Sequence, residues 1–431
     1  MASPPIERLW EALRDDVADE RLDPATEPKR IAELATQVVV RYGQEAAVGA
    51  VRPLSDPAGM VQRLVRLVCE YGPLTEALAS PATEEVLIED DRVLVVGEGR
   101  LRGLLEPTTA AINRHVVDKL LAETPVRLDP TTPLIQAQVL DGRARLTAAG
   151  PPVIGPSGVS ASLRLYKRRR VVLDDIVGWG TITPALADFA RLLMEALCSV
   201  VISGAPAAGK TTLFSALLSG IRENRCVRVV EEYPELYLPT PYGRCYHCRS
   251  ADSDGRGAVS LRDLVKFVLG MRADFIAVGE VRSDESWELT RAMNAGTGCG
   301  VTVHANSAED GLEALVSTAL GAGANVNEHH VRTTLAKGVD VVVHVERDDP
   351  NQVAEGDAYR RQVTEVRALM PQIERGEQKF STVLLFERAG GLGSPLVWTG
   401  LLPPTSLVDR LEQLLPQGRM LKHVLAGEGL R

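Results

Sequence analysis

The stretch from Gly204 to Thr212 has the residue types of a phosphate-binding loop. It reads GAPAAGKTT, so Gly204 is followed after four residues by Gly209, Lys210 and Thr211. This spacing satisfies G-x-x-x-x-G-K-[ST], in which a tight turn aims backbone N–H groups at phosphate oxygens. The lysine then bridges the terminal phosphates, and the threonine hydroxyl is a ligand for Mg²⁺. The alternative is a strand-to-helix turn that binds nothing.

Both flanks of this loop support the phosphate-binding interpretation. The apolar run VVIS before it predicts a buried strand, and TLFSALLSGI after it predicts a helix. A helix N-terminus carries unpaired N–H groups and a positive partial charge, and both attract anions. The predicted nucleotide-binding residues of the loop are Gly204, Ala205, Pro206, Ala207, Ala208, Gly209, Lys210, Thr211 and Thr212.

Three further predicted strands end in side chains that could act on a bound phosphate. RVVEE ends in Glu231 and Glu232, and FIAVGEVR carries Glu280 after its apolar residues. GVTVHA places His304 at a fourth strand end. A carboxylate there can deprotonate an attacking water or hold Mg²⁺ through its water shell. Each alone could be a solvated turn or a surface residue, but four such strand ends in succession favour a catalytic site.

The alternation of strands and helices from residue 167 onward would bring these side chains to one edge. The short β-branched runs are CSVVISG, CVRVVEE, FIAVGE, GVTVHA and DVVVHVE. Such alternation is typical of a largely parallel sheet covered by helices, where ligands collect at the carboxyl ends of strands. We predict an α/β ATPase-type domain over 167–390 and a C-terminal tail, 391–431, with one helix, VDRLEQLL. The polar segment from about Asp348 to Glu374 is expected to end the sheet core.

The first part of the chain has two different patterns. Residues 1–70 predict a helical N-terminal extension, because apolar positions recur at helical spacing in IERLWEALRDDV and PAGMVQRLVRLVCEY. Residues 71–166 predict an α+β domain, with strands in EEVLIED and RVLVVGEGRL and a helix in AAINRHVVDKLLAET.

Composition is that of a globular protein with several domains. The chain has 431 residues, of which 45% are hydrophobic and 24% charged. A net charge of −9 and only 4% aromatic residues argue against a surface for nucleic acid. The start, MASPPIERLWEAL, lacks the pattern of a signal peptide, and no membrane span is expected. With six cysteines and no signal peptide, the thiols are expected to be reduced in the cytoplasm.

Four segments together resemble the signature boxes of a known family. GAPAAGKTT, VVEEYPEL, RADFIAVGEVR and AGTGCGVTVHANS are similar, in order and spacing, to those of the type II/type IV secretion and pilus-assembly ATPases. The CpaF-type branch of tight-adherence pili is the nearest. YGPLTEALASPATEEVLIE, TPLIQAQVLDGRARL and SASLRLYKR resemble the family's N-terminal domain, so the resemblance covers roughly residues 71–345.

The resemblance implies a role for individual residues. Lys210 and Thr211 match the phosphate-loop pair, with Thr211 on Mg²⁺. Glu231 matches the catalytic base. Glu280 matches the glutamate that holds Mg²⁺ through water, and His304 matches the second histidine of the histidine box.

Four arginines fall at or near family arginines that neutralise phosphate charge or link subunits. Arg272 and Arg282 are placed with the catalytic residues, and Arg145 and Arg164 with the nucleotide-binding ones; Arg145 aligns only with a one-residue insertion. The chain also departs from the family at three positions. Glu232 stands where an aspartate is usual, Thr297 replaces the first histidine of the histidine box, and Gln138 replaces an arginine of the N-terminal domain.

The resemblance further implies architecture, cofactors and partners. A RecA-like motor domain with an N-terminal domain folding over ATP and Mg²⁺ would assemble into a homohexamer. The ring would work on inner-membrane platform proteins, at the cytoplasmic face of the membrane. Two alternatives stay open: a motor that translocates nucleic acid, as in conjugation, and a nucleotide-regulated scaffold without turnover.

A second spacing points to metal chemistry without completing it. Cys245 and Cys248, with His247 between them, have the C-x-x-C spacing of half a zinc site. No second pair follows at a matching distance, so a loop with reduced thiols is the other interpretation.

Overall fold

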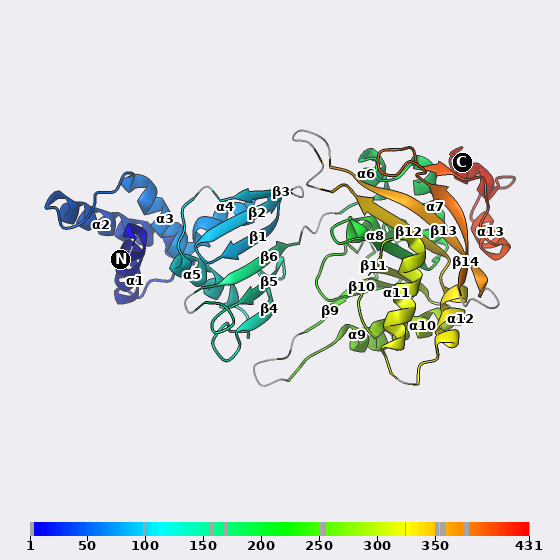
Figure 1. The fold of residues 1–431 in the computed structure, drawn as a ribbon, viewed down its shortest axis with the longest axis horizontal. Coiled ribbons are helices and arrows are strands. Elements are labelled where there is room, and N and C mark those ends of the chain that lie inside the picture. The colour runs from blue at the N-terminus through cyan, green and yellow to red at the C-terminus, as the bar shows by residue number, and fades with distance from the viewer. Residues whose placement is uncertain are drawn as a thin grey trace. The chain divides into compact units, whose positions relative to one another are not determined.

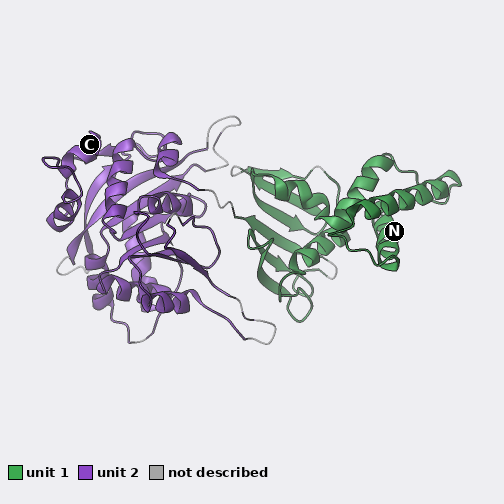
Figure 2. Ribbon diagram, turned by 180° about the vertical axis from the view of Figure 1, so that it is seen from behind, with its two compact units in different colours: residues 1–167 green, residues 168–431 purple. Residues whose placement is uncertain are grey.

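The computed structural model describes residues 4–97, 100–104, 106–155, 158–166, 170–238, 240–249, 251, 256–323, 325–349, 353, 359–373 and 379–430. The chain forms two compact units, Met1–Lys167 and Arg168–Arg431 (Figure 2). Each unit has its own buried apolar clusters, and each is described by itself.

Unit 1 begins with three helices, each started by a proline. They are α1 (Pro5–Asp19), α2 (Pro28–Ala47) and α3 (Pro57–Cys69) (Figure 1). Proline suits a first helical turn, because its φ is already helical and its missing N–H would have no partner there. Their apolar faces form one buried cluster that includes Leu9, Leu13, Ile31, Leu34, Leu64 and Leu67. The periodic pattern therefore predicts α1 and α3 correctly.

The rest of unit 1 is a six-stranded antiparallel sheet with a helix on one face. The strands are β1 (Thr83–Glu89), β2 (Arg92–Gly97), β3 (Arg100–Gly103), β4 (Leu134–Val139), β5 (Ala144–Ala149) and β6 (Ser160–Leu165), in the order β3-β2-β1-β6-β5-β4. A 3₁₀ turn, η1 (Gly72–Leu74), and α4 (Thr75–Ala79) lead into the sheet. Val116 and Leu120 of α5 (Ala110–Leu121) share a buried cluster with Ile88 and Leu163 of the strands. The opposite face carries the alternate, more polar side chains.

Unit 2 is built on a nine-stranded sheet. Its strands are β7 (Val200–Gly204), β8 (Val227–Glu231), β9 (Arg244–His247), β10 (Phe275–Val281), β11 (Gly298–His304), β12 (Val341–Arg347), β13 (Arg361–Ile373), β14 (Phe380–Glu387) and β15 (Val397–Trp398). Their order is β15-β14-β13-β12-β7-β11-β10-β8-β9, parallel from β12 to β9 and antiparallel from β12 to β15. All five strands predicted for this sheet from β-branched runs are present.

Helices cover both faces of this sheet (Figure 1). Alternate residues of the central strands belong to two separate buried clusters, Ile202 and Phe275 to one and Val201 and Ile276 to the other. The first cluster includes residues of α6 (Leu173–Gly178), α7 (Pro184–Glu195), α8 (Lys210–Leu218), α13 (Thr405–Glu412) and α14 (Leu421–Leu425). The second includes residues of α9 (Leu261–Leu269), α10 (Glu285–Asn294), α11 (Ala308–Leu320) and α12 (Glu328–Gly338). This is the predicted α/β, RecA-like P-loop architecture.

Two expectations for the end of the chain need correction. The segment 348–374 does not end the sheet core, because β13 lies in it and pairs along β12 and β14. Val363, Val366 and Ala368 of β13 are buried while charged residues alternate with them, which hid the strand in a segment that reads as polar. After the predicted helix, found as α13, a second short helix follows as α14.

No helix in the described parts of the chain is both long and apolar enough to cross a membrane. No disulfide joins any of the six cysteines, all of which lie in the described residues.

Candidate functional site

The phosphate loop leaves β7 at Gly204 and enters α8 at Lys210. A Cβ at Gly204 would lie 2.4 Å from the backbone oxygen of Val345 in β12, so only glycine fits there. Gly209 caps α8 with φ 94°, in the left-handed region that favours glycine. Both motif glycines are therefore required by the backbone, and the loop presents the N-terminus of α8.

The side chain of Lys210 folds back over this loop. Its Nζ donates to the backbone oxygens of Gly204 and Ala205, both at 3.0 Å, and contacts Nδ1 of His304 at 2.9 Å. An ammonium group has three N–H donors, and these acceptors can take all three. Phosphate oxygens could replace the two carbonyls without moving the lysine off the loop.

His304 connects the lysine to Glu280. Because an ammonium only donates, Nδ1 of His304 accepts, and Nε2 carries the proton toward Oε1 of Glu280. Partial burial lowers the pKa of His304; the Glu280 carboxylate opposes this, and the charges of Lys210 and Arg282 add to it. His304 is therefore neutral at neutral pH, in the form that can accept a hydrogen bond from lysine.

Arg282 extends these contacts to Glu232. Its Nη2 donates to Oε2 of Glu280 at 2.6 Å, and its Nη1 donates to Oε2 of Glu232 at 3.1 Å. The contacts thus run without a break through Lys210, His304, Glu280, Arg282 and Glu232, which we call the strand-end network. These residues lie at the carboxyl ends of β7, β11, β10 and β8, four neighbouring parallel strands.

Glu231 faces a different environment from its neighbour Glu232. It is 2% exposed, and its Oε1 accepts the backbone N–H groups of Glu235 at 3.1 Å and Leu236 at 2.8 Å. A Cβ built on Gly279 of β10 would lie 3.0 Å from its Cγ. The carboxylate is therefore enclosed between β10 and the segment that follows β8. Its assignment as the catalytic base stays a prediction.

Of the predicted arginines, only Arg282 lies in the strand-end network. Arg272 precedes β10, so it lies at the amino end of that strand, whereas Glu280 lies near the carboxyl end. The seven residues of β10 separate its two ends by about 20 Å. Its backbone oxygen accepts from Sγ of Cys226 and Nε of Arg228, both at 3.2 Å, and its side chain is exposed. The fold of unit 2 does not bring Arg272 to the phosphate loop.

Arg145 and Arg164 lie on unit 1. They are direct partners across β5 and β6, and Arg164 is also opposite Glu85 of β1. Gln138 of β4, which stands where the family has an arginine, is opposite Arg145. Gln138, Arg145 and Arg164 therefore lie in one row across β4, β5 and β6. Their role in nucleotide binding stays a prediction.

Two residues near the loop were missed in the sequence. Nδ1 of His344 in β12 lies 2.8 Å from Oγ of Ser203, the buried residue before Gly204, and fixes the base of the loop. Cδ of Arg361 lies 3.5 Å from a Cβ built on Gly209, so its side chain lies against the end of the loop. Ser203 is the only polar residue in VVIS, so a polar partner for it, here His344, could have been suspected. Arg361 lies in the segment that was predicted to end the sheet core.

The residues present suit Mg²⁺ as well as phosphate. The hydroxyl of Thr211, half-buried in the first turn of α8, and the carboxylate of Glu280 are oxygen donors of the kind that Mg²⁺ prefers. Both oxygens of Glu280 are engaged by His304 and Arg282, so an ion held through water fits better than one bound directly. Among the residues described, no group of three or more His, Cys, Asp or Glu could hold a metal by itself, and this includes the Cys245–Cys248 segment.

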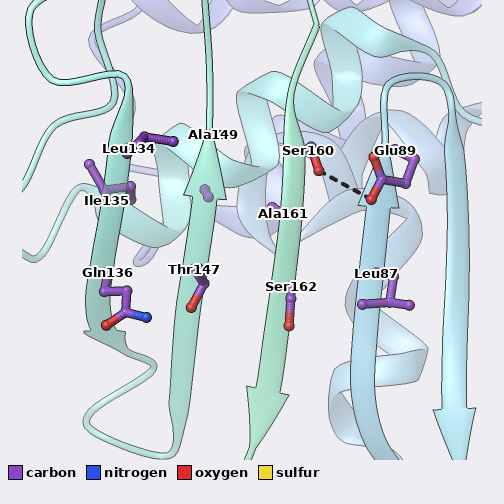
Figure 3. Close-up of a pocket in the computed structure, with 11 residues that line it drawn as sticks. Leu87, Glu89, Leu134, Ile135, Gln136, Thr147, Ala149, Ser160, Ala161 and Ser162 are labelled. Carbon is purple, nitrogen blue, oxygen red and sulfur yellow. Dashed lines mark hydrogen bonds between the residues drawn. The ribbon is translucent and has the colours of Figure 1, made fainter. Parts of the chain in front are cut away.

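A shallow hollow of about 500 Å³ lies on the outward face of the unit 1 sheet (Figure 3). Strands β4, β5, β6 and β1 line it with small, apolar and hydroxyl side chains such as Leu87, Thr147 and Ser162. Glu89 is its one ionisable residue and accepts a hydrogen bond from Ser160 at 3.1 Å. It lacks the converging charged groups of the phosphate loop, so the loop is the candidate site.

Comparisons with known proteins point to one family. The profile of the family described as "Type II/IV secretion system protein" matches residues 85–369. The "Putative conjugal transfer protein" of Mycobacterium tuberculosis is 32% identical over 306 residues, which are 69% of this chain and 84% of that protein. The type IV secretion system protein VirB11 of Bartonella quintana is 27% identical over 259 residues, 51% of this chain and 72% of that one. Among solved structures, the ATPase DotB of Legionella pneumophila superposes with a TM-score of 0.48 at 16% identity, over 68% of this chain and 78% of that one.

Proposed function

Because this chain belongs to the type II/IV secretion system protein family, we propose that it hydrolyses Mg–ATP to power a pilus or secretion machine. The observation that carries the proposal is the strand-end network, which joins Lys210 of the phosphate loop to Glu280 through His304. A structural turn would not need a charged contact across neighbouring strands at the edge where ligands of parallel sheets bind.

The loop and α8 supply the groups that bind the triphosphate. Backbone N–H groups of the loop meet phosphate oxygens, and Lys210 exchanges its two carbonyl partners for oxygens of the β- and γ-phosphates. Mg²⁺, held by Thr211 and through water by Glu280, would neutralise charge on the same phosphates. Arg282 is close enough to Glu280 to share that task.

Hydrolysis needs a base for the attacking water. The water oxygen bonds to the γ-phosphorus, the bond to the bridging oxygen of ADP breaks, and the water proton passes to a carboxylate. We assign that carboxylate to Glu231, supported by its position at the end of β8 and its neighbour Gly279 in β10. Glu235 and Leu236 both donate to Oε1 of Glu231, so the oxygen that would take the proton of the water is Oε2, which lies 3.8 Å from Nε2 of His247.

Our proposals for assembly and partners rest on family membership and not on a contact among the described residues. We propose a homohexamer in which Arg272, Arg145 and Arg164 act at the nucleotide of the same or a neighbouring subunit. We also propose that unit 1 closes over ATP, and that the ring acts on membrane platform proteins at the cytoplasmic side, where ATP is supplied. The CpaF-type branch and the domain boundaries at residues 70, 166 and 390 stay part of this proposal.

A second candidate is a motor for conjugation. Its support is the relative named as a conjugal transfer protein. The acidic balance and few aromatic residues leave little surface for stacking bases, so we propose that such a role would act through protein partners.

The test is steady-state ATP turnover by the purified full chain with Mg²⁺, beside Lys210→Ala. The proposal expects phosphate release by the wild type and none by the variant. Single-stranded DNA added to the same assay separates the alternatives: strong stimulation would favour a nucleic-acid motor. Nucleotide binding without turnover, under all conditions including added membrane partners, would favour a scaffold.

A further inference from the structure

We propose that the β12–β13 side of the phosphate loop binds the ribose and base of the nucleotide, with Arg361 on the ribose–phosphate part and Tyr359 stacked on the purine. This rests on the proposed function, because it assigns the other end of the same ligand. None of these residues belongs to the strand-end network.

The order of strands fixes the direction of the nucleotide. β7, which leads into the loop, lies between β11 and β12. His304, Glu280 and Glu232 all lie on the β11 side, on successive strands β11, β10 and β8. The γ-phosphate must point to these groups, so the rest of an extended nucleotide leaves the loop toward β12 and β13.

Arg361 is a charged side chain on that side and lies against the loop. Its Cδ lies 3.5 Å and its Cβ 3.9 Å from a Cβ built on Gly209, so the aliphatic stem rests on the last residue before α8. The stem thus lies against the loop while the guanidinium lies over the ring of Tyr359. Its planar set of donors suits the oxygens of an α-phosphate or a ribose.

Tyr359 is held in place by two arginines. The guanidinium of Arg361 lies over its ring, 5.2 Å from the centroid, and Nη1 of Arg347 donates to its hydroxyl at 2.8 Å. The half-buried ring is thus oriented before a ligand arrives. A fixed aromatic ring beside a phosphate site is the arrangement on which a base stacks.

The segment that follows α6 brings another aromatic residue, Trp179, to the start of β13. Gln362 Nε2 and Arg388 Nη2 both donate to the backbone oxygen of Gly180, at 3.0 and 3.3 Å. The backbone N–H of Val363 donates to the oxygen of Thr181 at 3.0 Å. Trp179, next to Gly180, is 49% exposed at this point. Trp179 is therefore an exposed aromatic residue in a segment whose backbone is tied to β13.

The neighbouring residue offers a matched control. Arg360 forms a salt bridge with Asp348, with Nε 2.9 Å and Nη2 3.0 Å from its oxygens. Arg360 and Arg361 are thus adjacent residues of one type: Arg361 lies against the phosphate loop, and Arg360 is paired with Asp348.

The test measures calorimetric binding of two probes to the full chain: a Mg complex of a non-hydrolysable ATP analogue, and Mg–tripolyphosphate, which has no base or ribose. Tyr359→Leu is expected to weaken the analogue about five- to hundredfold and to change tripolyphosphate less than twofold. Arg360→Ala should bind like the wild type, and Tyr359→Phe, which keeps the ring but loses the bond from Arg347, should weaken the analogue less than Tyr359→Leu does. Arg361→Ala should weaken the analogue at least fivefold, and it decides alone if Tyr359→Leu does not fold.

The outcomes separate the two proposals. If the wild type binds the analogue and both Tyr359→Leu and Arg361→Ala bind it within twofold, the base site is wrong and the phosphate site stands. If Tyr359→Leu weakens both probes equally, the ring supports the loop and the base site is again wrong. If the wild type binds neither probe, the proposed function fails, and the base site fails with it.

Discussion

Glu231 and Glu232 are adjacent in the chain, but their carboxylates lie in opposite environments. Glu231 is 2% exposed and accepts two backbone N–H groups, whereas the side chain of Glu232 is 42% exposed and pairs with Arg282. One is enclosed at the end of β8, and the other belongs to the strand-end network. The two roles can therefore be separated by substitution.

Glu231→Gln is expected to keep nucleotide binding and to reduce the turnover number by roughly 10²–10⁴-fold, the usual effect of removing a general base. The glutamine oxygen can still accept from Glu235 and Leu236, so the fold should persist. Glu232→Gln is the matched control and should have a smaller effect. The check is phosphate release beside analogue binding; a larger loss in Glu232→Gln would assign the base to Glu232.

His304→Ala should leave the protein folded and reduce the turnover number by about 10²-fold, because Lys210 and Glu280 then lose their shared positioning contact. The pH profile gives a second check. Since the pKa of His304 lies below its ordinary value, protonation breaks its bond from Lys210 only on the acid side of about pH 6.5. Wild-type turnover should therefore fall there, and the fall should be shallower in the variant. Identical profiles would exclude this histidine as the titrating group.

The sequence predicts the strands that carry the site better than the contacts among its side chains. β7, β8, β10, β11 and β12 are buried on both faces and read as continuous β-branched runs, a pattern that needs no knowledge of the neighbours. β13 alternates buried valines with charged residues, so its composition resembles a loop until β12 and β14 are placed beside it.

Side-chain partners depend on register and on where each strand ends. The motif spacing indicates that Lys210, Glu280 and His304 meet at one edge, and the structure brings them together. Glu231 is the last residue of β8, and Glu232 begins the turn after it. Adjacent residues of a strand point to opposite sides, so Glu232 and not Glu231 pairs with Arg282. Arg361 reaches the loop only because β13 returns antiparallel to β12.

His344 should make the stability of the protein depend on pH. Burial lowers its pKa, against smaller opposing effects of Glu346 and Glu365. The unfolded chain then binds a proton more readily than the folded one, so stability is complete above about pH 6.5 and is lost as pH falls toward the lower folded pKa. His344→Gln keeps an acceptor for Ser203 without this titration, so its thermal midpoint should fall less between pH 7.5 and 5.5. The exposed His329→Gln is the control and should follow the wild type.

Gly204→Ala and Gly209→Ala should differ in severity. The first places a Cβ 2.4 Å from the backbone oxygen of Val345, which cannot move aside without displacing β12. The second meets only the Arg361 side chain at 3.5 Å, so its main penalty is the positive φ, about 1–2 kcal/mol. We expect Gly204→Ala to lower the thermal midpoint more than Gly209→Ala. Equal midpoints would contradict the close approach of β7 and β12 at the loop.

Assembly should depend on nucleotide. Arg272 is exposed at the amino end of β10, and the phosphate loop lies at the carboxyl ends of the strands. Within its own subunit Arg272 therefore has no access to the phosphates bound at that loop. If it serves phosphate at all, it does so in a neighbouring subunit, and ligand then stabilises the ring by mass action. We expect the hexamer to be more populated with Mg²⁺ and a non-hydrolysable ATP analogue than without, and Arg272→Ala to reduce that difference. Light scattering over a concentration series, in both conditions, measures it. A protein that stays monomeric at tens of micromolar with nucleotide, yet hydrolyses ATP at full rate, would exclude the ring mechanism and leave the ATPase proposal intact.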